Sequence, residues 1–150
     1  MSQSFRLDKK VGYINRDKKI SFRFNGKKYF GYEGDTLASA LLANGVHLVG
    51  RSFKYHRPRG FLGVGVEEPN AQVQLYKDAK TEPNAIATTV ELVEGLVAKS
   101  QNCWPSVSLD FGEINNLLSK FFPAGFYYKT FMWPKSFWHK IYEPVIRKAA

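Results

Sequence analysis

Residues 51–70 carry the side chains best suited to chemistry, because a basic stretch there runs into a glycine-rich loop, RSFKYHRPRGFLGVGVEEPN. Glycines at Gly60, Gly63 and Gly65 let backbone amides approach a ligand without a side chain in between. Five cationic or ionisable side chains precede the loop: Arg51, Lys54, His56, Arg57 and Arg59. This combination predicts contact with an anion, and we take these five residues as the candidate interface or anion-contact site.

Single-stranded nucleic acid is one anion that such a stretch could hold. Phe53 and Tyr55 interleave with the charges, and single strands are bound by phosphate neutralisation together with base stacking on aromatic rings. No recognisable nucleic-acid module surrounds the stretch, so nucleic acid is the less favoured partner. The same residues would also clamp an anionic cofactor or an acidic subunit. A stand-alone module that binds anions or single-stranded nucleic acid stays an alternative to a role inside a larger assembly.

The glycine loop does not match a dinucleotide-binding fingerprint. Gly63 and Gly65 fit the start of G-x-G-x-x-G, but Glu68 stands where the third glycine belongs. A strand is expected to follow the loop, whereas the fingerprint opens a helix. The loop therefore belongs to another kind of site.

Catalytic and metal-binding patterns do not stand out in the sequence. His47, His56 and His139 are scattered, without the spacing of a metal site. Cys103 lies in QNCWPS with no paired histidine nearby, so a structural, buried thiol is expected. We predict no catalytic residue and no metal ligand, and the sequence identifies no cofactor-binding residue. An enzyme that relies on Cys103 or His56 alone is the least favoured hypothesis.

The composition indicates a folded, basic chain. Of 150 residues, 44% are hydrophobic, and 22 Lys and Arg against 13 Asp and Glu give a net charge of +9, which favours anionic partners. One cysteine excludes an internal disulfide and fits a reducing compartment. The start MSQSFRLDKK resembles no signal peptide, and no apolar run approaches the roughly 18 residues of a membrane span. We expect a soluble, cytoplasmic protein without membrane contact.

Two hairpins and one helix are the elements that must position the loop. Residues 20–24 alternate apolar and polar side chains, which predicts a strand. Asn25-Gly26 favours a type I′ turn, and residues 28–32 are expected to form the returning strand. Asp35 or Thr36 caps a helix that Asn44-Gly45 closes. Residues 71–76 predict another strand, and a second hairpin is expected around Glu94-Gly95. This order predicts an α+β, β-grasp domain over residues 20–102, preceded by a basic arm, 1–19, that is either packed on something else or mobile.

Residues 103–150 form a different region, predicted as an aromatic-rich helical extension. One helical stripe is expected to end at Pro123: Ile114, Leu117, Leu118, Phe121 and Phe122. Pro134 could open a second helix, which Pro144 would kink. Aromatic residues crowd positions 121–142, and so short a segment cannot bury them against itself. The extension is therefore expected to pack on a larger body.

The hairpin, the capped helix GDTLASALLANG and the loop PRGFLGVGV together resemble the two-iron plant-type ferredoxin fold, as found in amine- and opine-oxidising flavoenzymes. In those relatives the loop reads C-G-x-G-x-C-x-x-C, and cysteine thiolates hold the iron. Here the ligand places hold Leu62, Glu67 and Asn70, with the fourth near Thr88. The resemblance therefore implies a cluster-less domain, and we expect the loop to be filled by its own side chains, Leu62 and Val66 among them.

Four further strings extend this resemblance: GRSFKYHRPRG, EEPNA, SQNCWPS and FPAGFYYKTFMWP. With them the chain, from about Val11 to Ala150, is similar to the N-terminal part of alpha subunits of heterotetrameric sarcosine oxidases. In that family a ferredoxin-like domain without a cluster leads into a nucleotide-binding domain. We therefore expect a fragment or truncated subunit.

The activity that the resemblance implies is oxidative demethylation of sarcosine to glycine, with hydrogen peroxide formed and the one-carbon unit passed to tetrahydrofolate. FAD, FMN, NAD and zinc are distributed over the four subunits in that family, and the resemblance places none of them within this segment. The implied partners are the other subunits and the remainder of the alpha subunit. The expected role of this segment is non-catalytic docking, with residues 51–59 as the contact.

Overall fold

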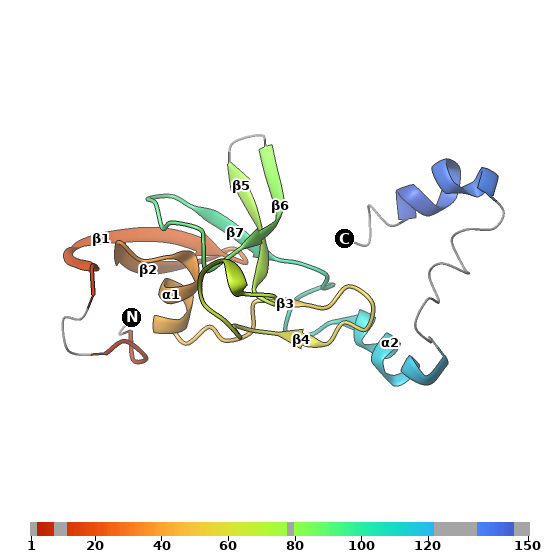
Figure 1. The fold of residues 1–150 in the computed structure, drawn as a ribbon, viewed down its shortest axis with the longest axis horizontal. Coiled ribbons are helices and arrows are strands. Elements are labelled where there is room, and N and C mark those ends of the chain that lie inside the picture. Colours follow the sequence, from red (N-terminus) through yellow and green to blue (C-terminus); the bar gives the residue numbers. More distant parts are fainter. Residues whose placement is uncertain (1–2, 8–11, 78–79, 122–134, 146–150) are drawn as a thin grey trace.

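The computed structural model describes residues 3–7, 12–77, 80–121 and 135–145. A five-stranded sheet in the order β2-β1-β7-β5-β6 carries one helix, α1, against its face (Figure 1). Its strands are β1 (Asn15–Phe24), β2 (Lys27–Glu33), β5 (Gln72–Lys77), β6 (Lys80–Ile86) and β7 (Val97–Ser100). Strands β1 and β7 pair in parallel and the other neighbours pair antiparallel. This mixed sheet with few helices fits the predicted α+β class.

The first hairpin agrees with its prediction. Ile20, Phe22 and Phe24 of β1 are buried, while Arg23 between them is exposed. Asn25 and Gly26 both have positive φ angles, 51° and 79°, as a type I′ turn requires.

Strand β1 begins earlier than the predicted start at residue 20 and includes the end of the segment assigned to the basic arm. Asn15 pairs with Glu33, and the register then shifts before Lys19 pairs with Tyr32. This irregularity interrupts the alternation of side chains. Because the extra length of the strand is polar and out of phase, the hydrophobic pattern did not reveal it.

Helix α1 (Leu37–Ala43) also forms where its sequence predicted. The Thr36 side chain accepts a hydrogen bond from the Ser39 amide, and the Ser39 hydroxyl accepts one from the Thr36 amide. This reciprocal capping box satisfies two amides that the first turn leaves without partners. The face toward the sheet is buried and comprises Leu37, Ala38, Ala40, Leu41 and Ala43.

The second hairpin is not where it was expected. Strands β5 and β6 form it, whereas the predicted turn at Glu94-Gly95 only leads into β7. Before that turn, the chain bonds to the start of α1, since Leu37 donates to the Val90 carbonyl and Leu92 donates to the Asp35 carbonyl. The residues of a turn determine only the local backbone conformation. Here the residues before the turn bind α1, so they do not pair with β7 after it.

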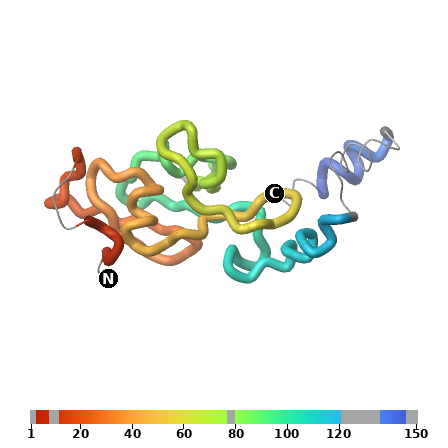
Figure 2. Tube along the Cα trace, turned by 60° about the horizontal axis from the view of Figure 1, so that its bottom comes forward, coloured from red at the N-terminus to blue at the C-terminus, as the bar shows by residue number. Residues whose placement is uncertain are grey.

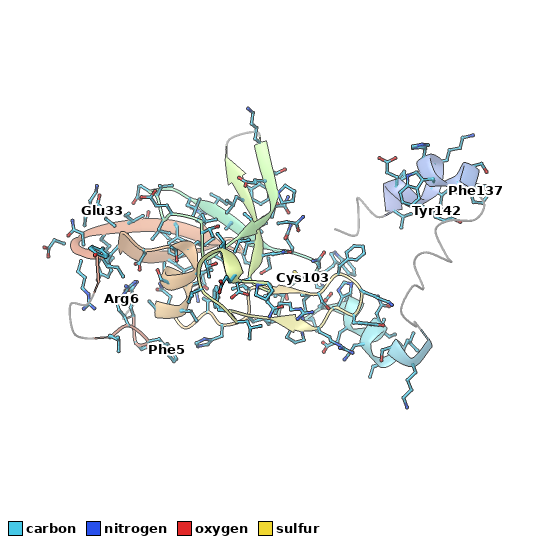
Figure 3. The ribbon with its side chains drawn as sticks, viewed as in Figure 1. Phe5, Arg6, Glu33, Cys103, Phe137 and Tyr142 are labelled. Atoms are coloured by element: carbon cyan, nitrogen blue, oxygen red, sulfur yellow. The ribbon has the colours of Figure 1, made fainter. Side chains whose placement is uncertain are left out.

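Residues 3–7 of the N-terminal arm pack on the domain itself. Arg6 binds both carboxylate oxygens of buried Asp35, at 3.1 and 2.6 Å. Phe5 meets the His47 ring edge-on, with 5.1 Å between ring centroids, and Figure 3 shows both arm residues close to α1. The prediction of an arm packed elsewhere or mobile is therefore wrong for these residues.

The region after β7 contains short helical turns where a longer helix was predicted. A 3-10 turn (Phe111–Glu113), α2 (Ile114–Leu117) and another 3-10 turn (Ser119–Phe121) follow one another. Phe122, Pro123 and Pro134 lie outside the described residues. A 3-10 turn (Lys135–Phe137) and a π-helical turn (Trp138–Tyr142) begin after them. Among the described residues, no helix has the length and apolar character to cross a membrane.

Candidate functional site: the basic hairpin and the glycine-rich loop

The basic stretch forms a hairpin of its own. Strand β3 (Gly50–Arg51) pairs antiparallel with β4 (Pro58–Arg59). Between them the Ser52 amide donates to the Arg57 carbonyl, and His56 adopts a positive φ of 52°. The stretch is therefore a closed loop with a fixed shape, which sequence patterning did not indicate.

Arg51 points into the protein. It is only 6% exposed, and its guanidinium donates to the carbonyls of Val107, at 3.0 Å, and His56, at 2.9 Å. It also forms ion pairs with Glu113, at 3.1 Å, and Asp110, at 3.9 Å. Figure 2 shows the hairpin, in yellow, beside the chain that follows β7. Arg51 thus binds residues 107–113 to the hairpin and is not presented to an outside anion.

His56 belongs to the same internal network. Its Nδ1 lies 2.7 Å from Oδ2 of Asp110, whose side chain is fully buried. The other oxygen of Asp110 accepts hydrogen bonds from the amides of Trp104 and Gly112, at 3.0 and 3.1 Å. Burial works to raise the pKa of Asp110, but these amide bonds and His56 outweigh it and hold the pKa below its ordinary value.

This depressed pKa predicts how acid affects stability. Because the folded pKa of Asp110 is below its unfolded value of about 3.9, its contribution is complete above that value and disappears as the pH falls through the folded pKa. The difference between the unfolding free energies of wild-type protein and D110N should therefore shrink as the pH falls through that folded pKa. Urea unfolding over a pH series measures this difference, and a difference that grows in acid would contradict the assignment.

The other three predicted residues lie nearer the surface. Lys54 and Arg57 each stand over the Tyr55 ring, 4.9 Å from its centroid. Arg57 also donates to the Asn116 side chain, at 2.9 Å, and Arg59 donates to the Asn70 side chain, at 2.9 Å. The structure therefore separates the five residues into an inward pair and an outward set of three. Their interface role stays a prediction.

A polar pocket of about 380 Å³ adjoins Arg59. Its lining is Arg51, Ser52, Phe53, Arg59, Pro69, Asn70, Gln72, Asn84 and Asn102. These residues include two arginines and four residues with side-chain amides but no carboxylate. The lining has the chemistry to receive an acidic group.

The interior of the glycine-rich loop is filled by Glu68, which is 2% exposed. One carboxylate oxygen accepts from the amides of Leu62 and Gly63, at 2.7 and 2.6 Å. The other accepts from the amides of Asn70 and Ala71, at 2.7 and 3.1 Å. Sequence reasoning considered Glu68 only as a break in a glycine pattern. An acidic residue inside a loop with many unpaired amides was the signal that could have revealed its role.

The expectation that Leu62 and Val66 fill the loop is wrong. Leu62 is 73% exposed and Val66 is 79% exposed. The loop amides face inward and need an acceptor, which an apolar side chain cannot supply. The carboxylate therefore takes the interior, and the apolar side chains lie outside.

The four positions that hold cysteine ligands in the ferredoxin pattern come near one another here, but their side chains are not the ligands of an iron-sulfur cluster. The Thr88 hydroxyl donates to the Gly65 carbonyl, at 2.5 Å, so the fourth place does adjoin the loop. None of Leu62, Glu67, Asn70 and Thr88 offers a thiolate. Among the described residues, no group of three or more His, Cys, Asp or Glu is arranged to hold a metal ion. The donor set therefore does not fit a two-iron cluster.

Cys103 is also a poor nucleophile. The thiol is partly buried and lies beyond β7. Burial raises its pKa, and the neighbouring Asp110 carboxylate raises it further. Because the thiolate is the reactive form, this environment disfavours covalent catalysis.

The fold and the loop define a ferredoxin-like domain, and the chain belongs to the 2Fe-2S iron-sulfur cluster binding domain family, whose model matches residues 17–103. It is 60% identical over 147 residues to the sarcosine oxidase subunit alpha of Rhizobium meliloti (strain 1021), covering 98% of this chain and 15% of that protein. This similarity confirms the resemblance to the N-terminal region of that subunit.

Two corynebacterial proteins show the same similarity at lower identity. The sarcosine oxidase alpha subunits of Corynebacterium sp. strains U-96 and P-1 are 41% and 40% identical over 88 residues, covering 57% of this chain and 9% of each protein. The chain thus spans less than a sixth of the length of the relatives it matches. Among solved structures, the chain is similar to L-proline dehydrogenase from P. horikoshii, at 26% identity and a TM-score of 0.45. The match covers 61% of this chain and 17% of that one.

Proposed function

We propose that this chain is the ferredoxin-like domain of the alpha subunit of a sarcosine oxidase-like flavoenzyme, and that it contributes structure rather than catalysis. The observation that carries the proposal is the 60% identity to such a subunit, which extends over 98% of this chain. The complete complex would demethylate sarcosine oxidatively to glycine and form hydrogen peroxide. FAD, FMN, NAD, tetrahydrofolate and zinc would be held outside this segment.

The domain carries no iron-sulfur cluster. The lack of any thiolate at Leu62, Glu67, Asn70 and Thr88 supports this part of the proposal. The only cysteine of the chain, Cys103, has a raised pKa and adjoins Asp110 rather than the loop. A domain of this kind passes no electrons through its loop.

The outer side of the glycine-rich loop is the docking surface. Three apolar side chains lie in solvent there: Leu62, Val64 and Val66. Exposed apolar side chains grouped in one place are typical of protein contacts. Nearby, Arg59 and its polar pocket can receive an acidic side chain from a partner. Lys54 and Arg57 would steer the same acidic partner.

The C-terminal aromatic residues support a second area of contact. Phe137 and Tyr142 lie on one helical segment, which Figure 3 shows apart from the sheet, and their ring centroids are 6.3 Å apart. Phe137, Trp138 and Ile141 are each more than two-fifths exposed. These side chains suit burial against the remainder of the subunit or a partner subunit.

A loop variant tests the docking role in the complete enzyme. The triple replacement L62S/V64S/V66S, made in the full alpha subunit and expressed with its partner subunits, should reduce assembled complex at least tenfold on size-exclusion chromatography, about 1.4 kcal/mol. The control L7S/V93S replaces exposed apolar residues away from the loop and from the C-terminal extension and should leave assembly unchanged. Normal assembly of the loop variant would contradict docking through this surface.

A further inference from the structure

Glu68 is the central residue of the glycine-rich loop. Its carboxylate joins the two ends of the loop, because one oxygen binds the amides of Leu62 and Gly63 and the other binds those of Asn70 and Ala71. All four distances lie between 2.6 and 3.1 Å. The residue is almost completely buried. It is thus a buried charge whose partners are all backbone amides.

The chemistry of the carboxylate matches this environment. An ionised carboxylate is an acceptor with about four lone-pair positions, and four inward amides use all of them. A buried charge is tolerated when hydrogen bonds replace its lost hydration. Burial works to raise the pKa of Glu68, but the bonds from the Gly63, Asn70, Leu62 and Ala71 amides outweigh it and hold the pKa below its usual value.

The position of Glu68 relates this carboxylate to the ligand pattern of the family. The residue lies between the second ligand place, Glu67, and the third, Asn70. Two of the amides that it binds belong to ligand places themselves, Leu62 and Asn70. Hydrogen bonds to the sulfur atoms are among the features that a protein supplies to an iron-sulfur cluster. In this loop the backbone amides, which are donors of that kind, already bind the Glu68 carboxylate.

We propose that the Glu68 carboxylate is the resident anion of this loop and replaces an iron-sulfur cluster as the group around which the backbone is organised. The inference rests on the cluster-less part of the proposed function and adds what occupies the loop instead. It also accounts for part of the docking surface, the outward orientation of an apolar side chain of the loop. Because the carboxylate holds the Leu62 amide inward, the Leu62 side chain is turned outward.

Amide hydrogen exchange on the 150-residue chain tests this role. In E68Q one acceptor oxygen becomes an NH2 donor, so either the Leu62 and Gly63 pair or the Asn70 and Ala71 pair loses its acceptor. Exchange of at least one pair should accelerate tenfold or more, because that pair loses its charged acceptor. E67Q is the matched control, because Glu67 is the exposed neighbour, and its exchange rates should stay within about twofold of wild type. Equal exchange in both variants would overturn the proposal.

A measurement on the wild-type chain keeps the proposal testable if E68Q does not fold. Carbon-detected NMR of the Glu68 side-chain carboxyl should show a titration midpoint below the ordinary glutamate value of about 4.3. A midpoint at or above that value would contradict a carboxylate bound by four amides. Neither readout depends on subunit assembly, so failure of the docking role and failure of this inference give different results.

Discussion

Replacement of Arg51 by methionine should lower the free energy of unfolding by about 3 kcal/mol, because removing one partner of a buried ion pair leaves the other uncompensated. Arg51 is buried beside Asp110 and donates to the carbonyls of Val107 and His56. Methionine keeps the apolar volume of the side chain but supplies no donor. Urea unfolding followed by circular dichroism measures the loss.

Arg57 provides the matched control for R51M. It lies in the same hairpin, but it is exposed and its guanidinium donates to the Asn116 side chain. The R57M replacement should change stability by no more than about 0.5 kcal/mol. Equal losses in the two variants would show that Arg51 does not bind residues 107–113 to the hairpin.

Replacement of Asp35 by asparagine should lower the free energy of unfolding by about 2 kcal/mol, the scale of hydrogen bonds to a buried charged group. Asp35 is 1% exposed and accepts from Arg6, the Ser39 hydroxyl and the Tyr32 amide. Asparagine keeps the shape but loses the charge and turns one acceptor into a donor. The N-terminal arm should detach at the same time, which trypsin cleavage after Arg6 would report.

Glu33 is the control for D35N, since it lies two residues away at the end of β2. Its ion pair with Lys18 is exposed on both sides, and such pairs contribute between about 0 and 1 kcal/mol. E33Q should therefore have a small effect. Comparable destabilisation by both variants would contradict the role of Asp35 as the anchor of the arm.

The parts of the fold that could be predicted from the sequence are those set by local signals. Asn25 and Gly26 specify their turn because both adopt positive φ, and Thr36 specifies the start of α1 through its own side chain. Glu94 and Gly95 give an equally clear turn signal, yet the strands on either side do not pair with each other. That outcome depends on contacts of Val90 and Leu92 with residues far away in the sequence.

The candidate site could be located from the sequence but not oriented. The basic stretch and the glycines mark the right segment, yet composition does not tell which cations face inward. Arg51 and His56 turn inward because Asp110 and Glu113, more than fifty residues later, lie against them. The role of Glu68 depends likewise on four amides that only the folded loop brings together.

The most direct test of the central claim is an analysis of iron and acid-labile sulfide in the purified chain, after anaerobic incubation with ferrous iron, sulfide and a thiol reductant. A loop whose amides are bound by Glu68 and whose ligand places lack thiolates should retain no stoichiometric iron and show no visible charge-transfer bands. Two irons and two sulfides per chain, with those bands, would contradict the account.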